Sequence, residues 1–271
     1  TRRSSDLTRQ GDGADADRVH RGREGRVTER KAHDAAGRPP DAVTAVRDCE
    51  LRVIEHRWAM TEERATEIAA FWERQRALNP GYFDGVVFIA LDIRIVGGVL
   101  YGELFASRFR NFLYWRDTGF ADTSVTDAFG SAILRSSDGG VLLARQRGGN
   151  VNAGQVYLPG GFIDERVIAA GGSVDILGSI EREIGEETGL DTAAMTRDEG
   201  YTVTRAGPHV SISATFRTGL DATTLANRVG AHLGRDPEAE LESVRVVRSL
   251  GELSGVPLVR YCDTLLPVLL G

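Results

Sequence analysis

Three glutamates near the middle of the chain are the residues best suited to chemistry. Glu183, Glu186 and Glu187 stand three and four residues apart, and residues at these spacings share one face of a helix. Like charges so placed repel each other, and the C-terminal end of a helix, where they would stand, is itself negative. A divalent cation would turn this repulsion into attraction. With no Cys or His nearby, the oxygen donors favour Mg²⁺ or Mn²⁺.

The residues around the glutamates predict the helix that must carry them. Leu177, Ile180 and Ile184 fall on a neighbouring face that can pack into a core. Gly189 predicts the end of the helix, because glycine is the usual residue for the left-handed position just beyond a helix. Upstream, a turn that follows a strand is predicted for the Leu-Pro-Gly-Gly run at 158–161.

This pattern resembles the signature of the Nudix hydrolases, G-x5-E-x7-R-E-U-x-E-E-x-G-U, in which U is an aliphatic residue. Every specified position of its second half matches, from Arg182 to Leu190. The first half matches only at Gly161, because the spacing from that glycine to Arg182 exceeds that of the signature by seven residues. The excess implies an insertion within residues 162–173.

The resemblance implies a role for each residue of this stretch. Gly161 would bind the metal through its carbonyl oxygen, and the three glutamates through their carboxylates. Arg182 would orient the glutamates by pairing with Glu186 and with Asp175, which follows the position of the first signature glutamate, here Val174. Arg182 and the three glutamates are the expected catalytic set. Bound metal would lower the pKa of a water molecule and stabilise the leaving phosphate, with a glutamate inside or outside the cluster as general base.

The order of the predicted elements is compatible with the Nudix fold. A hairpin is predicted from residues 129–134 and 141–145. Strands at 201–205 and 209–217, a helix at 221–233, a strand at 242–247 and an amphipathic segment at 258–270 follow. Upstream, a strand near 51–54, a helix that ends before Asn79-Pro80 and strands at 86–91 and 99–107 predict an additional unit. The resemblance therefore implies an α/β protein of the Nudix fold, a mixed β-sheet sandwiched between helices, with an N-terminal α+β extension.

The chain also resembles one branch of the superfamily, the UDP-glucose and UDP-galactose diphosphatases. The similar features are residues 80–85, the aromatic stretch 109–113, the insertion after the Pro-Gly-Gly turn, and residues 237–242. This branch implies hydrolysis of the pyrophosphate bond of a nucleotide sugar to a nucleoside monophosphate and a sugar phosphate. It also implies that the insertion and the aromatic stretch face the substrate. ADP-ribose, a dinucleoside polyphosphate and a non-hydrolytic ligand-binding module of the same fold stay open as alternatives.

Arginine must supply any phosphate clamp in the folded part, because Lys31 is the sole lysine. Its planar guanidinium suits phosphate oxygens. Arg145 and Arg147 are candidates, because they follow a predicted strand that leads to the Pro-Gly-Gly turn, and Tyr114 and Arg116 are candidates in the aromatic stretch. The aromatic side chains of this stretch are equally typical of a hydrophobic core.

The composition favours a cytoplasmic protein with a small-molecule nucleotide as its partner. A net charge of −6 gives no reason to expect nucleic-acid binding, and no apolar run reaches the length of a membrane span. Cys49 and Cys262 are far apart in the chain, which suggests a reducing compartment. The oligomeric state is left open.

Three segments are predicted along the 271 residues. Residues 1–44 contain almost no large apolar side chains and are expected to be a disordered tail, or sequence from outside the natural protein. Residues 45–125 are expected to form an N-terminal extension packed on the catalytic domain. Residues 126–271 are expected to form the Nudix hydrolase domain.

Overall fold

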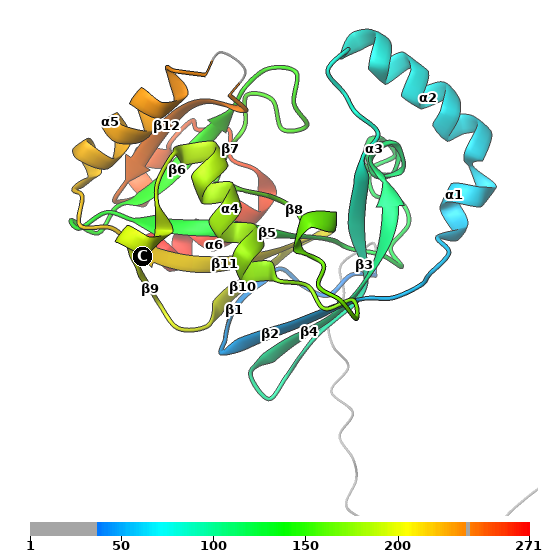
Figure 1. Ribbon diagram of the computed structural model, residues 1–271, viewed down its shortest axis with the longest axis horizontal. Coiled ribbons are helices and arrows are strands. Elements are labelled where there is room, and N and C mark those ends of the chain that lie inside the picture. The colour runs from blue at the N-terminus through cyan, green and yellow to red at the C-terminus, as the bar shows by residue number, and fades with distance from the viewer. Residues whose placement is uncertain (1–36, 237–238) are drawn as a thin grey trace, which may run out of the picture. The chain divides into compact units, whose positions relative to one another are not determined.

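The computed structural model describes residues 37–236 and 239–271, whose strands form two sheets (Figure 1). The large sheet has the order β1 (Ala42–Val46), β10 (Tyr201–Ala206), β11 (His209–Arg217), β5 (Asp127–Arg135), β6 (Val141–Gln146) and β12 (Leu241–Val247). Three short strands extend it, β7 (Val156–Tyr157) on β6, β8 (Gly160–Phe162) on β5 and β9 (Thr196–Arg197) on β11. The sheet is mixed, because β11 and β5 run parallel and their neighbours pair antiparallel.

The smaller sheet consists of β2 (Asp48–Val53), β4 (Val99–Arg108) and β3 (Val86–Val96). Helices α1 (Ala59–Glu63), α2 (Ala65–Leu78) and α3 (Phe109–Asp117) belong to the same stretch of chain. A second hydrophobic cluster joins the helices to β3 and β4, with Trp58, Phe71, Trp72, Phe105 and Trp115 among its buried members. This part of the chain is the predicted α+β extension.

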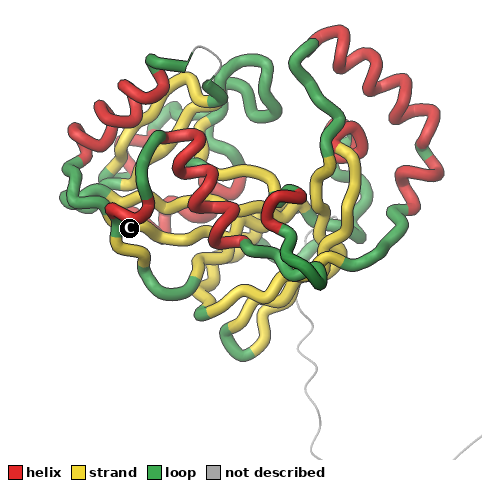
Figure 2. Tube along the Cα trace, in the orientation of Figure 1, coloured by secondary structure: helices red, strands yellow, loops and turns green. Residues whose placement is uncertain are grey.

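Helices cover both faces of the large sheet (Figure 2). The ring of Phe129 lies 5.1 Å from that of Tyr261 in α6 (Arg260–Leu270), whereas a Cβ at Gly130 would lie 2.8 Å from Cγ1 of Ile180 in α4 (Ile176–Glu183). Successive strand residues point to opposite faces, so α4 and α6 pack on opposite sides. The predicted fold class, a mixed sheet between helices, is confirmed.

Elements with a strong sequence pattern lie where they were predicted. The hairpin β5–β6 and strand β12 agree with prediction to within a few residues. Helix α5 (Ala222–Leu233) buries Leu225, Val229 and Leu233, and Asp221 caps it by accepting a hydrogen bond from the backbone N–H of Thr224. Short 3₁₀ turns occur at Glu165–Val167, Thr192–Ala194 and Leu250–Leu253. No helix among residues 37–236 and 239–271 has both the length and the apolar character to cross a membrane.

The predicted boundary of the tail is wrong at its C-terminal side. Residues 1–36 of the tail lie outside the described residues, but residues 37–44 are ordered. Ala42–Val46 forms β1, whose residue Val46 pairs with Tyr201 of β10. Arg38 is buried and donates a hydrogen bond of 2.6 Å to the carbonyl of Phe120. A short edge strand of small residues carries too weak a hydrophobic signal to be seen before its partner is known. The division between extension and catalytic domain at residue 125 stays a prediction.

Candidate active site

The Pro-Gly-Gly turn brings the backbone of β8 against the signature helix. Gly160 has a φ of 155°, and a Cβ at this position would clash with the carbonyl oxygen of Gly130. At Gly161 a Cβ would lie 2.9 Å from Oε2 of Glu183. Both glycines are therefore required by close approach, the first to β5 and the second to a carboxylate. Gly161 and Glu183 are brought together as predicted.

Glu187 is almost completely buried beside the same turn, with 7% of its surface exposed. The backbone N–H of Gly160 donates a hydrogen bond of 2.8 Å to its Oε2, and the Tyr157 hydroxyl donates one of 3.2 Å to its Oε1. Burial raises the pKa of Glu187 well above its usual value, and the charge of Glu183 adds to this effect. The two hydrogen bonds oppose the shift without cancelling it.

Glu183 shares this environment. Burial also raises the pKa of its carboxyl, and Arg182 counteracts the shift through a hydrogen bond of 3.0 Å from Nη2 to Oε1. The charges of Glu186 and Glu240 raise this pKa further. Two desolvated carboxylates whose charges repel each other therefore lie against the Gly160–Gly161 backbone.

The predicted role of Asp175 is wrong. Asp175 caps α4, and its Oδ1 accepts a hydrogen bond of 2.9 Å from the backbone N–H of Gly178. Arg182 stands seven residues further, about 10 Å along a helix axis, which is out of reach for the capping side chain. Asp164 takes the predicted place, because its Oδ2 lies 3.1 Å from Nη2 of Arg182.

The insertion supports the signature helix more than it lines the substrate side. Besides Asp164, it contributes Arg166, whose guanidinium lies 2.7 Å from Asp164 and 3.2 Å from Glu186. Its far end docks on β2, where the backbone N–H of Val53 donates to the carbonyl of Gly172 over 2.7 Å. One signal could have pointed to Asp164, namely an acidic residue shortly after the Pro-Gly-Gly turn. Phe162, at the start of the insertion, does line the cleft described below.

Glu186 differs from the other two signature glutamates. Helix α4 ends at Glu183, and the chain continues in a π-helical turn, Ile184–Thr188, which Gly189 ends with a φ of 66° as predicted. The wider π turn changes the expected α-helical spacing of the side chains. The side chain of Glu186 is 52% exposed against 15% for Glu183, and it pairs with Arg166 and, at 3.7 Å, with Arg182.

The donor set fits a hard divalent cation. Glu183 and Glu187 are oxygen donors with pKa values raised by burial and by each other's charge, and the missing side chain at Gly161 leaves its backbone open to them. A cation bound there would lower both pKa values and satisfy the carboxylates. Within the described residues no three His, Cys, Asp or Glu side chains converge as a metal cluster. The participation of Glu186 as a ligand therefore stays a prediction.

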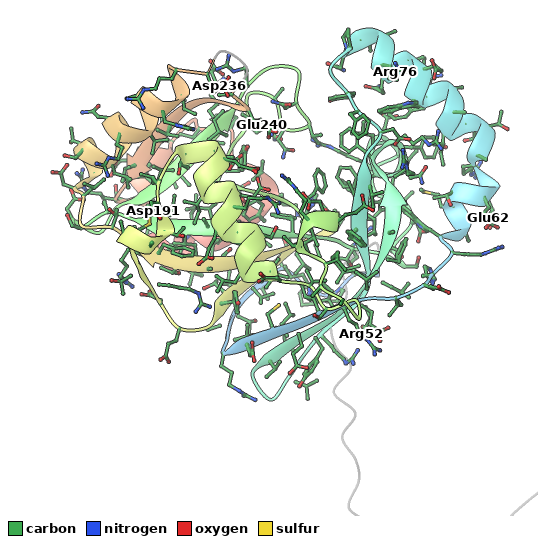
Figure 3. The ribbon with its side chains drawn as sticks, in the orientation of Figure 1. Arg52, Glu62, Arg76, Asp191, Asp236 and Glu240 are labelled. Atoms are coloured by element: carbon green, nitrogen blue, oxygen red, sulfur yellow. The ribbon has the colours of Figure 1, made fainter. Side chains whose placement is uncertain are left out.

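A cleft of about 530 Å³ extends from this turn to the N-terminal extension. Gly160, Gly161 and Glu240, the last labelled in Figure 3, lie in its wall. The wall also carries aromatic side chains from both parts of the chain, among them Tyr82, Phe109, Phe112, Phe120, Phe129 and Phe162. Phe112 and Phe162 meet edge to face at 4.9 Å between ring centroids. Phe112 is buried and also lines the cleft, and its contact with substrate stays a prediction.

Only one of the four predicted substrate contacts lines this cleft. Arg116 projects from α3 into its wall and is partly buried. Tyr114 instead donates a hydrogen bond of 2.6 Å to Oε2 of Glu67 on α2. Arg145 pairs with Glu242 at 3.4 Å and lines a smaller cavity. Arg147 donates a hydrogen bond of 3.4 Å to the carbonyl of Leu241.

Comparisons with known proteins find several similar solved structures and one family of domains. The chain is similar to the MutT protein from Methanosarcina mazei Go1, with 19% identity, 52% of this chain and 91% of that chain covered, and a TM-score of 0.34. It is similar to the Nudix hydrolase RenU from M. smegmatis, with 17% identity, coverage of 52% and 81%, and a TM-score of 0.35. These scores are too low to carry an argument about function.

A third similar structure is a bifunctional NMN adenylyltransferase/ADP ribose pyrophosphatase from Francisella tularensis in complex with AMP and a manganese ion. It has 14% identity and a TM-score of 0.37, and the match covers 59% of this chain and 46% of that one. No curated protein sequence matches the chain. Residues 126–256 match the NUDIX domain. This part of the chain is therefore similar to the NUDIX domain.

Proposed function

We propose that this protein hydrolyses the pyrophosphate bond of a nucleoside diphosphate linked to another moiety, with a nucleotide sugar as its substrate and Mg²⁺ or Mn²⁺ as its cofactor. The products are a nucleoside monophosphate and a sugar phosphate. The observation that carries the proposal is the cleft, which joins the Gly160–Gly161 turn and its two buried carboxylates to an aromatic wall. Such a wall suits flat rings, and the carboxylate end suits a metal-bound diphosphate.

In this proposal Glu183, Glu187 and the carbonyl oxygen of Gly161 hold the metal, and Glu186 completes the set. The metal, when bound, supplies charge stabilisation for the diphosphate and a water of lowered pKa. Arg182 keeps the Glu183 carboxylate in position, and Asp164 in turn keeps Arg182 in position. These contacts exist in the protein before substrate arrives, so the carboxylates need little rearrangement.

A proton acceptor outside the signature is available at the cleft. Glu240 lines the cleft, and its charge acts on both Glu183 and Glu187. Glu240 is exposed, and a carboxylate at this place can accept the proton of the attacking water. Arg116 lies in the same wall and supplies a positive charge for the phosphates.

A substrate panel tests the proposal. UDP-glucose, UDP-galactose, ADP-ribose and diadenosine tetraphosphate would be incubated with Mg²⁺ or Mn²⁺, and phosphate would be measured after coupled phosphatase treatment. We expect the highest kcat/KM for a nucleotide sugar and no turnover in EDTA. Higher kcat/KM for ADP-ribose or the dinucleoside polyphosphate would reject the nucleotide sugar, and binding without turnover on every substrate would indicate a ligand-binding module.

A further inference from the structure

One part of the cleft wall carries a polar pair that the signature chemistry does not use. Asp127 begins β5, His209 begins β11, and the two residues are partners in the register of these parallel strands. Nδ1 of His209 lies 2.9 Å from Oδ2 of Asp127. Both residues line the cleft. Asp127 is 5% exposed, whereas 24% of the His209 side chain is exposed.

The second carboxylate oxygen of Asp127 lacks a donor. Oδ1 is buried and accepts no hydrogen bond from any residue that the structure describes. Buried polar atoms of native proteins are nearly always satisfied by protein, water or ligand, and an unsatisfied carboxylate oxygen is costly. Its place in the wall of the cleft indicates that a hydrogen-bond donor of a ligand belongs there.

Asp127 also fixes the orientation of the histidine. A hydrogen bond from Nδ1–H to Oδ2 leaves Nε2 of the neutral ring as an acceptor. The His209 side chain makes no other hydrogen bond within the described part of the chain. Two acceptors of one dyad, Oδ1 and Nε2, are therefore left for a ligand that offers two donors.

Phe120 holds the histidine ring from the side. Its φ of 56° is the only positive value at a non-glycine residue among the described residues, and this conformation is costly for a large side chain. Its ring packs edge-on against His209 at 5.0 Å and against Trp115 at 4.8 Å. Strained residues of this kind collect at ligand sites, where the surroundings over-determine their conformation.

The dyad stands at a defined distance from the carboxylate end of the cleft. Gly161 of β8 pairs with Gly130 of β5, and Asp127 precedes Gly130 by three residues, which is about 10 Å along a strand. A substrate whose diphosphate lies at Gly161 would bring the sugar attached to that diphosphate towards Asp127 and His209.

We propose that Asp127 and His209 form a subsite for two neighbouring hydroxyl groups of a sugar ring in the substrate. One hydroxyl donates to Oδ1 of Asp127 and the other to Nε2 of His209. The inference rests on the proposed function and names the part of the substrate that determines specificity. The ribose of the nucleoside and the sugar of the leaving group share this chemistry.

The test combines variants and probes in a cycle. UDP-glucose, 2′-deoxy-UDP-glucose and UDP-2-deoxyglucose would be compared with wild type, Asp127→Asn and His209→Gln. Both kcat/KM with Mg²⁺ and dissociation constants from calorimetry in EDTA and in Ca²⁺ would be measured. We expect wild type to discriminate against one deoxy probe by about tenfold or more, as for a buried hydrogen bond to a charged group. Asp127→Asn should lose this discrimination, and the affected probe identifies the sugar.

A matched variant and two outcomes keep the test decisive. Asp198→Asn removes a carboxylate that pairs with Arg217 over 2.7 Å and does not line the cleft. This variant should not change the discrimination against the deoxy probes. Equal losses on all three probes in Asp127→Asn would overturn the subsite. Binding of UDP-glucose without hydrolysis would reject the proposed function alone, because calorimetry still tests the subsite. Hydrolysis in which Asp127→Asn leaves the discrimination against the deoxy probe unchanged would reject the subsite alone.

Discussion

The backbone N–H of Gly160 donates a hydrogen bond of 2.8 Å to Oε2 of Glu187. This contact joins the Pro-Gly-Gly turn to the end of the signature helix, although the insertion separates the two in sequence. It holds a buried carboxylate in one orientation, and Tyr157 holds the other oxygen. The carboxylate is thus positioned for a ligand by groups that are not ligands themselves, which is the arrangement that metal sites require.

Glu187→Gln should abolish most activity without destabilising the metal-free protein. The amide can still accept from Gly160 and interact with Tyr157, and it removes a buried charge that repels Glu183. We expect kcat to fall about 100-fold or more, because metal-borne charge stabilisation is worth several kcal/mol. Melting curves with and without Mg²⁺ should show an unchanged or higher Tm in EDTA and a smaller gain with Mg²⁺. A mutant that melts well below wild type in EDTA would mean that Glu187 is structural.

The stability of the metal-free protein should depend on pH through the two buried glutamates. Burial raises the folded-state pKa of both Glu187 and Glu183 above 4.5. A raised carboxyl pKa contributes stability that is present below pH 4.5 and lost as pH rises towards the folded value. Wild type in EDTA should therefore lose Tm relative to Glu187→Gln as the pH rises above 4.5. Stabilisation by Mg²⁺ should grow over the same range, because metal and protons compete. Parallel Tm profiles of the two proteins would contradict this.

Asp164→Asn and Asp175→Asn should separate the two candidates for orienting Arg182. Asp164 lies 3.1 Å from the guanidinium, so its loss should lower kcat about 10- to 100-fold, as for residues that support metal ligands. Asp175 caps α4, and Asn is an equally good cap, so Asp175→Asn should keep activity and Tm. The experiment measures kcat and Tm for both variants. Loss of activity in Asp175→Asn alone would restore the role predicted from the signature.

Arg116→Gln should raise KM for the nucleotide substrate about tenfold, because a partly buried guanidinium in the cleft wall contributes a charge-assisted hydrogen bond to phosphate. Arg145→Gln is the matched control. Arg145 is paired with Glu242 outside this cleft and its side chain is 46% exposed, so KM should be unchanged. Steady-state kinetics of the two variants decide which arginine contacts the substrate. A raised KM only in Arg145→Gln would place the phosphates elsewhere.

A chain that starts at residue 37 should keep the Tm and activity of the full chain, because residues 1–36 contain almost no large apolar side chains. A chain that starts at Ala45 should be less stable. It loses most of β1, the contact of Arg38 with Phe120, and the hydrogen bond of 2.8 Å from the backbone N–H of Gly207 to Asp41. We expect the free energy of unfolding to fall by about 2–4 kcal/mol, at about 1 kcal/mol for each hydrogen bond lost. Equal stability of the two truncated chains would show that β1 contributes nothing.

The sequence predicts those features that depend on local pattern. The signature helix and its end at Gly189 follow from residue spacing and from the left-handed preference of glycine. The partner of Arg182 does not, because Asp164 reaches it only through the path of the insertion, which β2 helps to fix. The Asp127–His209 pair is likewise invisible in the sequence, since the two residues meet only when β5 and β11 pair in parallel.

Strands β1 and β2 are separated by Arg47 alone, yet they belong to different sheets. Val46 of β1 pairs with Tyr201, so β1 must wait during synthesis until β10 has left the ribosome. Pairing of strands that are distant in sequence requires the closure of a large loop. The entropy lost in this closure precedes the stabilising contacts, which slows folding. Until β1 arrives, the outer edge of β10 presents unpaired N–H and C=O groups to other chains. During refolding, β1 of the same chain therefore competes with other protein molecules for the edge of β10. Dilution slows the contacts between molecules and should raise the refolding yield.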